Sequence, residues 1–216
     1  MTAVAARRIE ESPYVILIVY TTSDDAAACG YEPWLIEVDN PFFNAIPGVL
    51  AYQNWKVEGA HTLPYSYFDL QGLETEADLE RVWFNPTLDN FRKNWIKLWG
   101  YGRAPPQPIH LHAYGLRPVF ASNRPPQSTA SISAGTGPLP TDADLVWRVD
   151  EVIRKHFATT EQGTRWRWPA RENNPFGRTW FAVRYGHISV NNNSDALDNY
   201  SGRLIAAPAS SSAQRS

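Results

Sequence analysis

The sequence predicts a protein of the α+β class, and three observations support this prediction. Residues 14–114 contain segments of strand-like and helix-like hydrophobic spacing in the order β-α-β-β-α-β. Hydrophobic residues make up 43% of the 216-residue chain, which is enough to bury a core. The longest apolar run, residues 14–20, is too short to span a bilayer, so we expect a buried strand there.

The first strand is followed by a helix and a second strand. The helix is expected over about 25–38, because apolar residues recur there at helical spacing. The Asn40-Pro41 pair should end this helix, since proline interrupts helical hydrogen bonding. The Pro47-Gly48 turn then leads into a second strand over 49–57.

A third strand, a second helix and a fourth strand complete the order. The third strand is expected over 65–70. Thr75 can cap the second helix, with Asp78 in a looser form of the capping box. After a proline interruption the helix resumes as one apolar stripe over 88–99. With a fourth strand over 109–114, the arrangement is ferredoxin-like.

The rest of the chain is expected to form a linker, an extension and a tail. Residues 122–140 are rich in Pro, Ser, Thr and Gly, which indicates a linker or long loop. Residues 141–205 form a C-terminal extension, with a helix over 142–157 and a strand over 180–190. Residues 206–216 are predicted to be a disordered tail.

Charge and cysteine content indicate which partners and which location to expect. The net charge is -2 and the basic residues are scattered, so we expect neither nucleic acid nor a membrane as a partner. The single cysteine, Cys29, excludes an internal disulfide and suits a reducing compartment. No secretory signal is evident near the start of the sequence, and the expected location is the cytoplasm.

Three short segments resemble the dimeric α/β barrel superfamily. They are Asn40-Pro41-Phe42-Phe43-Asn44, Ala45-Ile46-Pro47-Gly48-Val49 and Tyr67-Phe68-Asp69-Leu70. The superfamily includes stress-responsive barrel proteins, EthD-like proteins, antibiotic-biosynthesis-type monooxygenases and certain polyketide cyclases. The resemblance implies that residues 1–121 form a ferredoxin-like barrel domain, that two copies join as a homodimer, and that a small-molecule cavity adjoins each sheet.

Two histidines separated by one residue suggest a site on the fourth strand. In an extended strand, His110 and His112 point the same way. A sheet face with two histidines is costly to bury unless it lines a wet or catalytic cavity. Taking the less apolar face of every predicted strand gives one candidate lining: Tyr14, Tyr20, Tyr52, Asn54, Tyr65, Tyr67, Asp69, His110, His112 and Tyr114.

These residue types suit proton transfer on an aromatic molecule. In the predicted site, one of the two histidines abstracts or delivers the proton, Asp69 orients that imidazole, and Tyr67 stabilises a developing oxyanion. The remaining residues are predicted to bind the substrate: Tyr14, Tyr20, Tyr52, Asn54, Tyr65 and Tyr114.

Other interpretations of the same residues stay open. The two histidines can be structural, or they can ligate a metal ion with His61 or Asp69 as a third ligand. We expect neither a metal nor another cofactor. Some family monooxygenases use a strand Asn beside a Trp, and the Asn54-Trp55 pair is similar to that pattern.

The leading functional hypothesis is a cofactor-independent lyase. It would be a dehydratase, decarboxylase or cyclase that uses histidine acid/base chemistry on a hydrophobic aromatic or polyketide-like small molecule. The alternatives are a cofactor-independent monooxygenase of phenolic substrates and a non-catalytic stress protein that binds small molecules.

Overall fold

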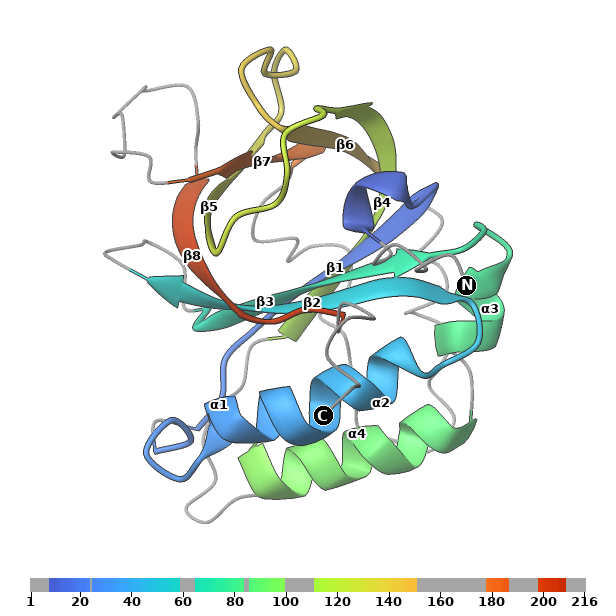
Figure 1. Ribbon diagram of the computed structural model, residues 1–216, viewed down its shortest axis with the longest axis vertical. Coiled ribbons are helices and arrows are strands. Elements are labelled where there is room, and N and C mark those ends of the chain that lie inside the picture. The colour runs from blue at the N-terminus through green and yellow to red at the C-terminus, as the bar shows by residue number, and fades with distance from the viewer. Residues whose placement is uncertain are drawn as a thin grey trace, which may run out of the picture.

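The strands of the protein close into a barrel whose members come from both ends of the sequence. The computed structural model describes residues 8–23, 25–58, 65–83, 86–99, 111–150, 178–186 and 198–208. Within them the barrel order is β1-β3-β2-β8-β5-β7-β6-β4, and every neighbouring pair is antiparallel (Figure 1). The strands are β1 (Tyr14–Tyr20), β2 (Val49–Glu58), β3 (Tyr67–Leu73), β4 (Leu111–Ala121), β5 (Thr129–Gly135), β6 (Leu145–Asp150), β7 (Trp180–Tyr185) and β8 (Asp198–Ala206).

The barrel consists of two four-stranded halves with the same strand order. The N-terminal half, β1 to β4, runs β4-β1-β3-β2, and the C-terminal half, β5 to β8, runs β8-β5-β7-β6. Adding four to each strand number of the first half gives the second. Pairing of β2 with β8 and of β4 with β6 joins the halves into one closed sheet. The predicted α+β class is confirmed.

Closure within one chain removes the reason for expecting a homodimer. That expectation assumed an open four-stranded sheet that needs a second copy to cover its edges. Here β8 and β6 of the same chain pair with the edges of the N-terminal half. The extension after residue 121 therefore supplies the partner strands itself.

Helices form a layer on one side of the barrel. α1, α2 and α4 lie against the β1 to β3 side, and η2 also contacts β8, whereas no described helix covers β5, β6 or β7 (Figure 1). The helical elements are η1 (Ile9–Glu11), α1 (Tyr31–Trp34), the π-helical turn η2 (Leu35–Asp39), α2 (Asn40–Asn44), α3 (Asp78–Trp83) and α4 (Pro86–Trp99). Within the described residues, no helix is long and apolar enough to span a membrane.

The first helical region differs from its predicted extent. It begins at Tyr31 and continues through Pro41 to Asn44, so the predicted stop at Asn40-Pro41 is wrong. Pro41 cannot donate a backbone hydrogen bond, and it lies at the junction of η2 and α2, one residue after Asn40, whose N–H donates to Leu35 O in the π-helical pattern. The wider π turn η2 precedes it and keeps the chain helical.

The other elements of the N-terminal half are found where they were predicted, although β3 ends three residues later than expected and β4 continues to Ala121. β1 has the predicted bounds, and β2 is one residue longer than expected. Asp78 Oδ2 accepts hydrogen bonds from the backbone N–H and the hydroxyl of Thr75, which confirms the predicted cap of α3. The stripe of α4 is confirmed at Leu88, Trp95 and Trp99, but the predicted stripe residue Leu98 is 44% exposed.

Two segments of the C-terminal half are strands where other structures were expected. β5 lies inside residues 122–140, which had the composition of a linker, and β6 occupies residues 145–150 of the predicted helix. β5 alternates Ala130, Ile132 and Ala134 in the barrel core with serines on the other face. Small side chains fit there because large aromatic residues already fill the barrel. The expected strand over 180–190 is observed as β7, and the remainder of that range lies outside the described residues.

Both faces of the β1 to β3 sheet are buried. One face fills the barrel, where Val15, Leu17 and Val19 of β1 belong to the interior core cluster. The other face lies under the helices, where Tyr14, Ile16, Ile18 and Tyr20 alternate with them. Polar side chains on this second face are consequently enclosed by the helical layer.

Candidate active site

The register of three strands brings the polar residues of the helix-covered face together. Asp69 on β3 lies directly opposite Asn54 on β2 and Ile18 on β1. Tyr20 and Tyr52 lie in the two adjacent cross-strand rows of the same face, at diagonal positions from Asp69. Diagonal neighbours are within reach of long aromatic side chains. The sheet thus surrounds one carboxyl group with two phenols and an amide.

Asp69 accepts three hydrogen bonds at this point. Tyr52 Oη donates to Oδ2 at 2.8 Å, Asn54 Nδ2 donates to Oδ1 at 3.0 Å, and Tyr20 Oη donates to Oδ1 at 3.3 Å. None of these four residues is more than 4% exposed. Donors on both neighbouring strands therefore hold the carboxyl group, and solvent is excluded from it.

A second buried carboxyl group reaches the same point from the helical layer. Asp39, at the end of η2, is 4% exposed, and its Oδ2 accepts a hydrogen bond of 2.8 Å from Asn54 Nδ2. Asn54 thus uses the two hydrogens of one amide nitrogen on two different carboxyl groups. Asn40 Nδ2 donates to Asn54 Oδ1 at 2.9 Å, which fixes the orientation of the bridging amide.

A line of aromatic donors completes the cluster. Trp95 Nε1 on α4 donates to Tyr31 Oη at 3.0 Å, and Tyr31 Oη donates to Tyr20 Oη at 3.1 Å. Tyr20 in turn donates to Asp69, so the hydroxyl groups form a hydrogen-bonded chain that ends on this carboxyl group. We call the following set the carboxyl site: Tyr20, Tyr31, Asp39, Asn40, Tyr52, Asn54 and Asp69.

Burial changes the acidity of both carboxyl groups. Desolvation raises the pKa of Asp39 to about 7, although hydrogen bonds from Asn54 and Tyr52 oppose the shift. Desolvation, and then the negative charge of Asp39, raises the pKa of Asp69 well above its usual range. The pair therefore keeps a proton near neutral pH, because two adjacent buried carboxylates repel each other.

The phenols of the site stay neutral hydrogen-bond donors. Desolvation is the largest cause that raises the pKa of Tyr20, Tyr31 and Tyr52 well above its usual range, and the neighbouring carboxyl groups add to it. The site thus combines a carboxyl pair that can accept and return one proton near pH 7 with donors that stabilise negative charge. Burial of two carboxyl groups is costly for folding, so such a pair in an interior is a functional-site candidate.

The structure separates the residues that the sequence grouped together. Tyr20, Tyr52, Asn54 and Asp69 converge as predicted. Tyr67 stacks on Tyr20 with ring centroids 5.8 Å apart, but no described hydrogen bond joins its hydroxyl to Asp69. Burial raises the pKa of Tyr67 to about 12.

Three predicted substrate-binding tyrosines lie elsewhere. Tyr65 and Tyr114 belong to the core inside the barrel, across the sheet from Asp69, so grouping them with Asp69 was wrong. The reason is that both faces of this sheet are buried, and polarity alone does not tell them apart. Tyr14 lies on the helix-covered face but donates to Asp150 Oδ2 at 3.3 Å and contacts Arg117, in a separate cluster.

The histidine predictions fall largely outside the structural description. His110 and His61 are not among the described residues, and for His112 the description covers only the backbone, which pairs with Val19 of β1. The roles proposed for these histidines therefore stay predictions. Among the described residues, no group of three or more His, Cys, Asp or Glu side chains could hold a metal ion.

Sequence reasoning missed the helical contribution to the site. Asp39, Asn40 and Tyr31 all come from the region whose end was placed at Asn40-Pro41. Tyr31, Leu35 and Asp39 recur at intervals of four, and all three are buried. An acidic residue in an otherwise apolar helical stripe was the available signal.

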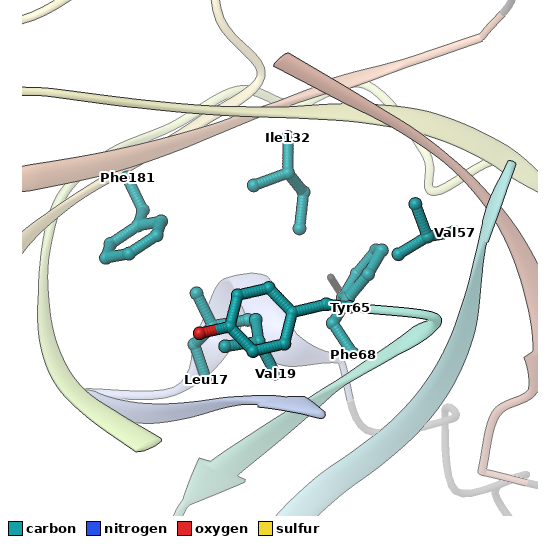
Figure 2. A pocket seen from close by; sticks show the side chains of 7 residues that line it. All are labelled: Leu17, Val19, Val57, Tyr65, Phe68, Ile132 and Phe181. Atoms are coloured by element: carbon teal, nitrogen blue, oxygen red, sulfur yellow. The ribbon is translucent and has the colours of Figure 1, made fainter. Parts of the chain in front are cut away.

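A small cavity inside the barrel differs from the carboxyl site in its lining. It has a volume of about 10 Å³, close to the minimum for one water molecule. Figure 2 shows side chains from β1, β2, β3, β5 and β7 that point toward it, together with Tyr65: Leu17, Val19, Val57, Tyr65, Phe68, Ile132 and Phe181. The lining residues that the structure describes contain no carboxyl, amide or imidazole group.

Comparison with known proteins gives structural matches alone. No family model and no curated protein sequence matches the chain. A proposed monooxygenase from Fusobacterium nucleatum subsp. nucleatum matches with a TM-score of 0.52 at 10% identity, covering 91% of this chain and 94% of that one. At such low identity, this match shows a shared fold.

Two further solved structures match less closely. A proposed monooxygenase from Lactobacillus acidophilus has a TM-score of 0.49 at 8% identity, over 93% of this chain and 97% of that one. HapK from Hahella chejuensis has a TM-score of 0.36 at 16% identity, over 46% of this chain and 89% of its own.

Proposed function

We propose that the protein is a cofactor-independent monooxygenase of phenolic aromatic substrates. The observation that carries this proposal is the buried Asp39 and Asp69 pair bridged by one amide nitrogen of Asn54. A carboxyl pair that titrates near pH 7 can remove a proton from an acidic phenol or from a C–H group activated by one. Removal of that proton makes the aromatic ring electron-rich enough to react with O2.

The reaction balances without an added reductant. The deprotonated substrate supplies electrons to O2, one oxygen atom enters the substrate as a carbonyl that replaces a CH2 group, and the other leaves as water. The carboxyl pair takes up the first proton and returns it as water forms. The Tyr20 hydroxyl, which donates to Asp69 and accepts from Tyr31, would stabilise oxygen-centred negative charge by turning its hydrogen bond from Asp69 to the substrate oxygen.

Two further observations favour this activity over the lyase hypothesis. The Fusobacterium protein that shares the fold is named as a proposed monooxygenase. Asn54, whose pairing with Trp55 in the sequence is similar to the pattern of some family monooxygenases, lies at the centre of the carboxyl site, whereas Trp55 faces the barrel interior. We further propose that the N-terminal half is a ferredoxin-like unit of the dimeric α/β barrel superfamily, and that the substrate is a small aromatic molecule.

Oxygen uptake during turnover of phenols tests the proposal. We expect the wild-type protein to consume O2 in proportion to substrate oxidised and to place one atom from ¹⁸O2 in the product. Asp69→Asn should abolish this uptake, and Asp39→Asn should reduce it. Gln53→Leu is a matched control, because Gln53 is buried on the opposite face of β2 and bonds only Trp55 in the described contacts. Substrate conversion without O2 uptake would instead establish the lyase.

A further inference from the structure

Gln71 is a buried polar residue that the proposed reaction does not use. It lies two residues beyond Asp69 on β3, so both side chains are on the helix-covered face of the sheet. In the cross-strand register, Gln71 is directly opposite Tyr52, whose hydroxyl donates to Asp69. Gln71 therefore belongs to the row of residues adjacent to the carboxyl pair.

The amide of Gln71 has no hydrogen-bond partner in the described part of the protein. Its side chain is fully buried, and neither Nε2 nor Oε1 is bonded. An unbonded buried amide is costly for folding, and nearly all buried polar groups in proteins are paired. Because both atoms are unbonded, the conclusion does not depend on which way the amide is turned.

Gln53 provides a comparison on the opposite face of the sheet. It is also buried on the sheet, but it faces the other side, and its Oε1 accepts a hydrogen bond of 3.2 Å from Trp55 Nε1. On the helix-covered face, the amides of Asn40 and Asn54 are bonded as well. Gln71 is thus the exception beside a fully bonded cluster.

We propose that Gln71 binds the substrate of the carboxyl site, through a group that offers an acceptor and a donor side by side. The Nε2–H of Gln71 donates to the acceptor, and Oε1 accepts from the donor. A primary amide or a protonated carboxyl group has this pattern. The assignment rests on the proposed function, because it takes the phenol of the same molecule to react at the carboxyl pair.

The spacing defines the ligand further. Residues two apart on one face of a strand are separated by about 7 Å. That separation is comparable with the width of one substituted aromatic ring. A phenol that carries an amide or carboxyl group across the ring can therefore reach Gln71 and the Asp39 and Asp69 pair together.

Binding of three matched phenols tests the assignment without requiring turnover. The probes are 4-hydroxybenzamide, which has both polar partners, 4-hydroxyacetophenone, which lacks the donor, and 4-ethylphenol, which lacks both. Isothermal titration calorimetry on the full chain should show the tightest binding for 4-hydroxybenzamide and the weakest for 4-ethylphenol. The Kd values of these two probes should differ by at least about tenfold. In Gln71→Leu the three Kd values should become similar.

Two controls make either outcome decisive. Gln53→Leu should keep the wild-type order of affinities, and Gln71→Met gives a second apolar replacement in case the leucine variant unfolds. Equal wild-type affinities for the three phenols, or an order that persists in both Gln71 variants, would overturn the assignment. Ordered binding by a protein that consumes no O2 would leave Gln71 assigned and reject the monooxygenase instead.

Discussion

The two halves of the barrel share a strand order and differ in what their outer faces carry. β3 is central in the N-terminal half, and its outer face presents Asp69 and Gln71 beneath a helical layer. β7 occupies the corresponding place in the C-terminal half, and at its outer face Ala182 packs with Trp180 and Val146 in a small apolar cluster. The same framework therefore holds a buried polar site in one half and an apolar cover in the other.

The connections between strands explain much of this difference. In the N-terminal half, β1 and β2 are joined through α1, η2 and α2, which bring Asp39 and Tyr31 to the sheet. In the C-terminal half, residues 136–144 join β5 to β6 without a helix, and Leu139 and Ala143 of this connection cover the strands. A shared strand order thus fixes the scaffold, while the covering segments decide whether it becomes a site.

The largest expected effect comes from removing the carboxyl group of the N-terminal half. Asp69→Asn should lower turnover of a phenolic substrate by at least about a hundredfold, because the group that holds the transferred proton is lost. Ser133→Ala changes a buried polar residue on the outer face of the C-terminal half and should leave turnover within about twofold. Steady-state kinetics on both variants checks the contrast, and similar losses in the two would show that the halves do not divide function in this way.

A core residue of the C-terminal half should affect stability instead. Phe181 is 2% exposed inside the barrel, with its ring 5.0 Å from that of Tyr114. Phe181→Ala should lower the free energy of unfolding by about 3–5 kcal/mol, because it leaves a cavity in the packed core. Urea unfolding measures this loss, while turnover per folded molecule should stay close to that of the wild type. A large fall in turnover by fully folded Phe181→Ala would contradict the division.

The sequence predicted the first half of the barrel better than the second. β1 is apolar or aromatic throughout, and β2 alternates apolar with mixed positions, so their hydrophobic patterns mark them clearly. β5 consists of Ala, Ser, Thr, Gly and one Ile, a composition typical of loops, and only its pairing with β7 and β8 makes it a strand. Tertiary context decides such segments, and a single sequence does not contain that context in local form.

The site was predicted in part for a related reason. Tyr20, Tyr52, Asn54 and Asp69 could be grouped because strand alternation places them on one face. The same rule misplaced Tyr65, which precedes β3 and belongs to the barrel core. Where both faces of a sheet are buried, alternation separates two sets of residues but does not identify which set meets the helices.

The carboxyl pair of the N-terminal half should make the stability of the protein depend on pH. Burial raises the pKa of Asp39 to about 7, so the folded protein holds a proton there that the unfolded chain releases near pH 4. Between these values the folded state binds more protons, and the free energy of unfolding should therefore fall as pH rises from about 4 to about 7. Above that window, this group should contribute no further change.

Asp39→Asn isolates this contribution. Urea unfolding at several pH values should give a shallower fall for the variant than for the wild type, because the introduced amide does not titrate and Asp69 loses a charged neighbour. Turnover by the wild type should rise through the same pH window as the pair becomes able to accept a proton. Identical pH profiles of stability in the two proteins would show that Asp39 keeps an ordinary acidity.

The smallest expected effect is that of dilution. It tests whether the two halves of one chain cover each other's sheet edges without a second copy. In a barrel assembled from two chains, the melting temperature depends on protein concentration, because dissociation exposes the paired edges. Here β2 pairs with β8 and β4 pairs with β6 within one chain, so the barrel has no edge that only a second copy could cover. We therefore expect the melting temperature and turnover per molecule to stay constant over a roughly hundredfold dilution in the micromolar range. Sedimentation across the same range provides the independent measurement. A melting temperature that falls on dilution, together with a dimer that dissociates, would show that the C-terminal half does not replace a second subunit.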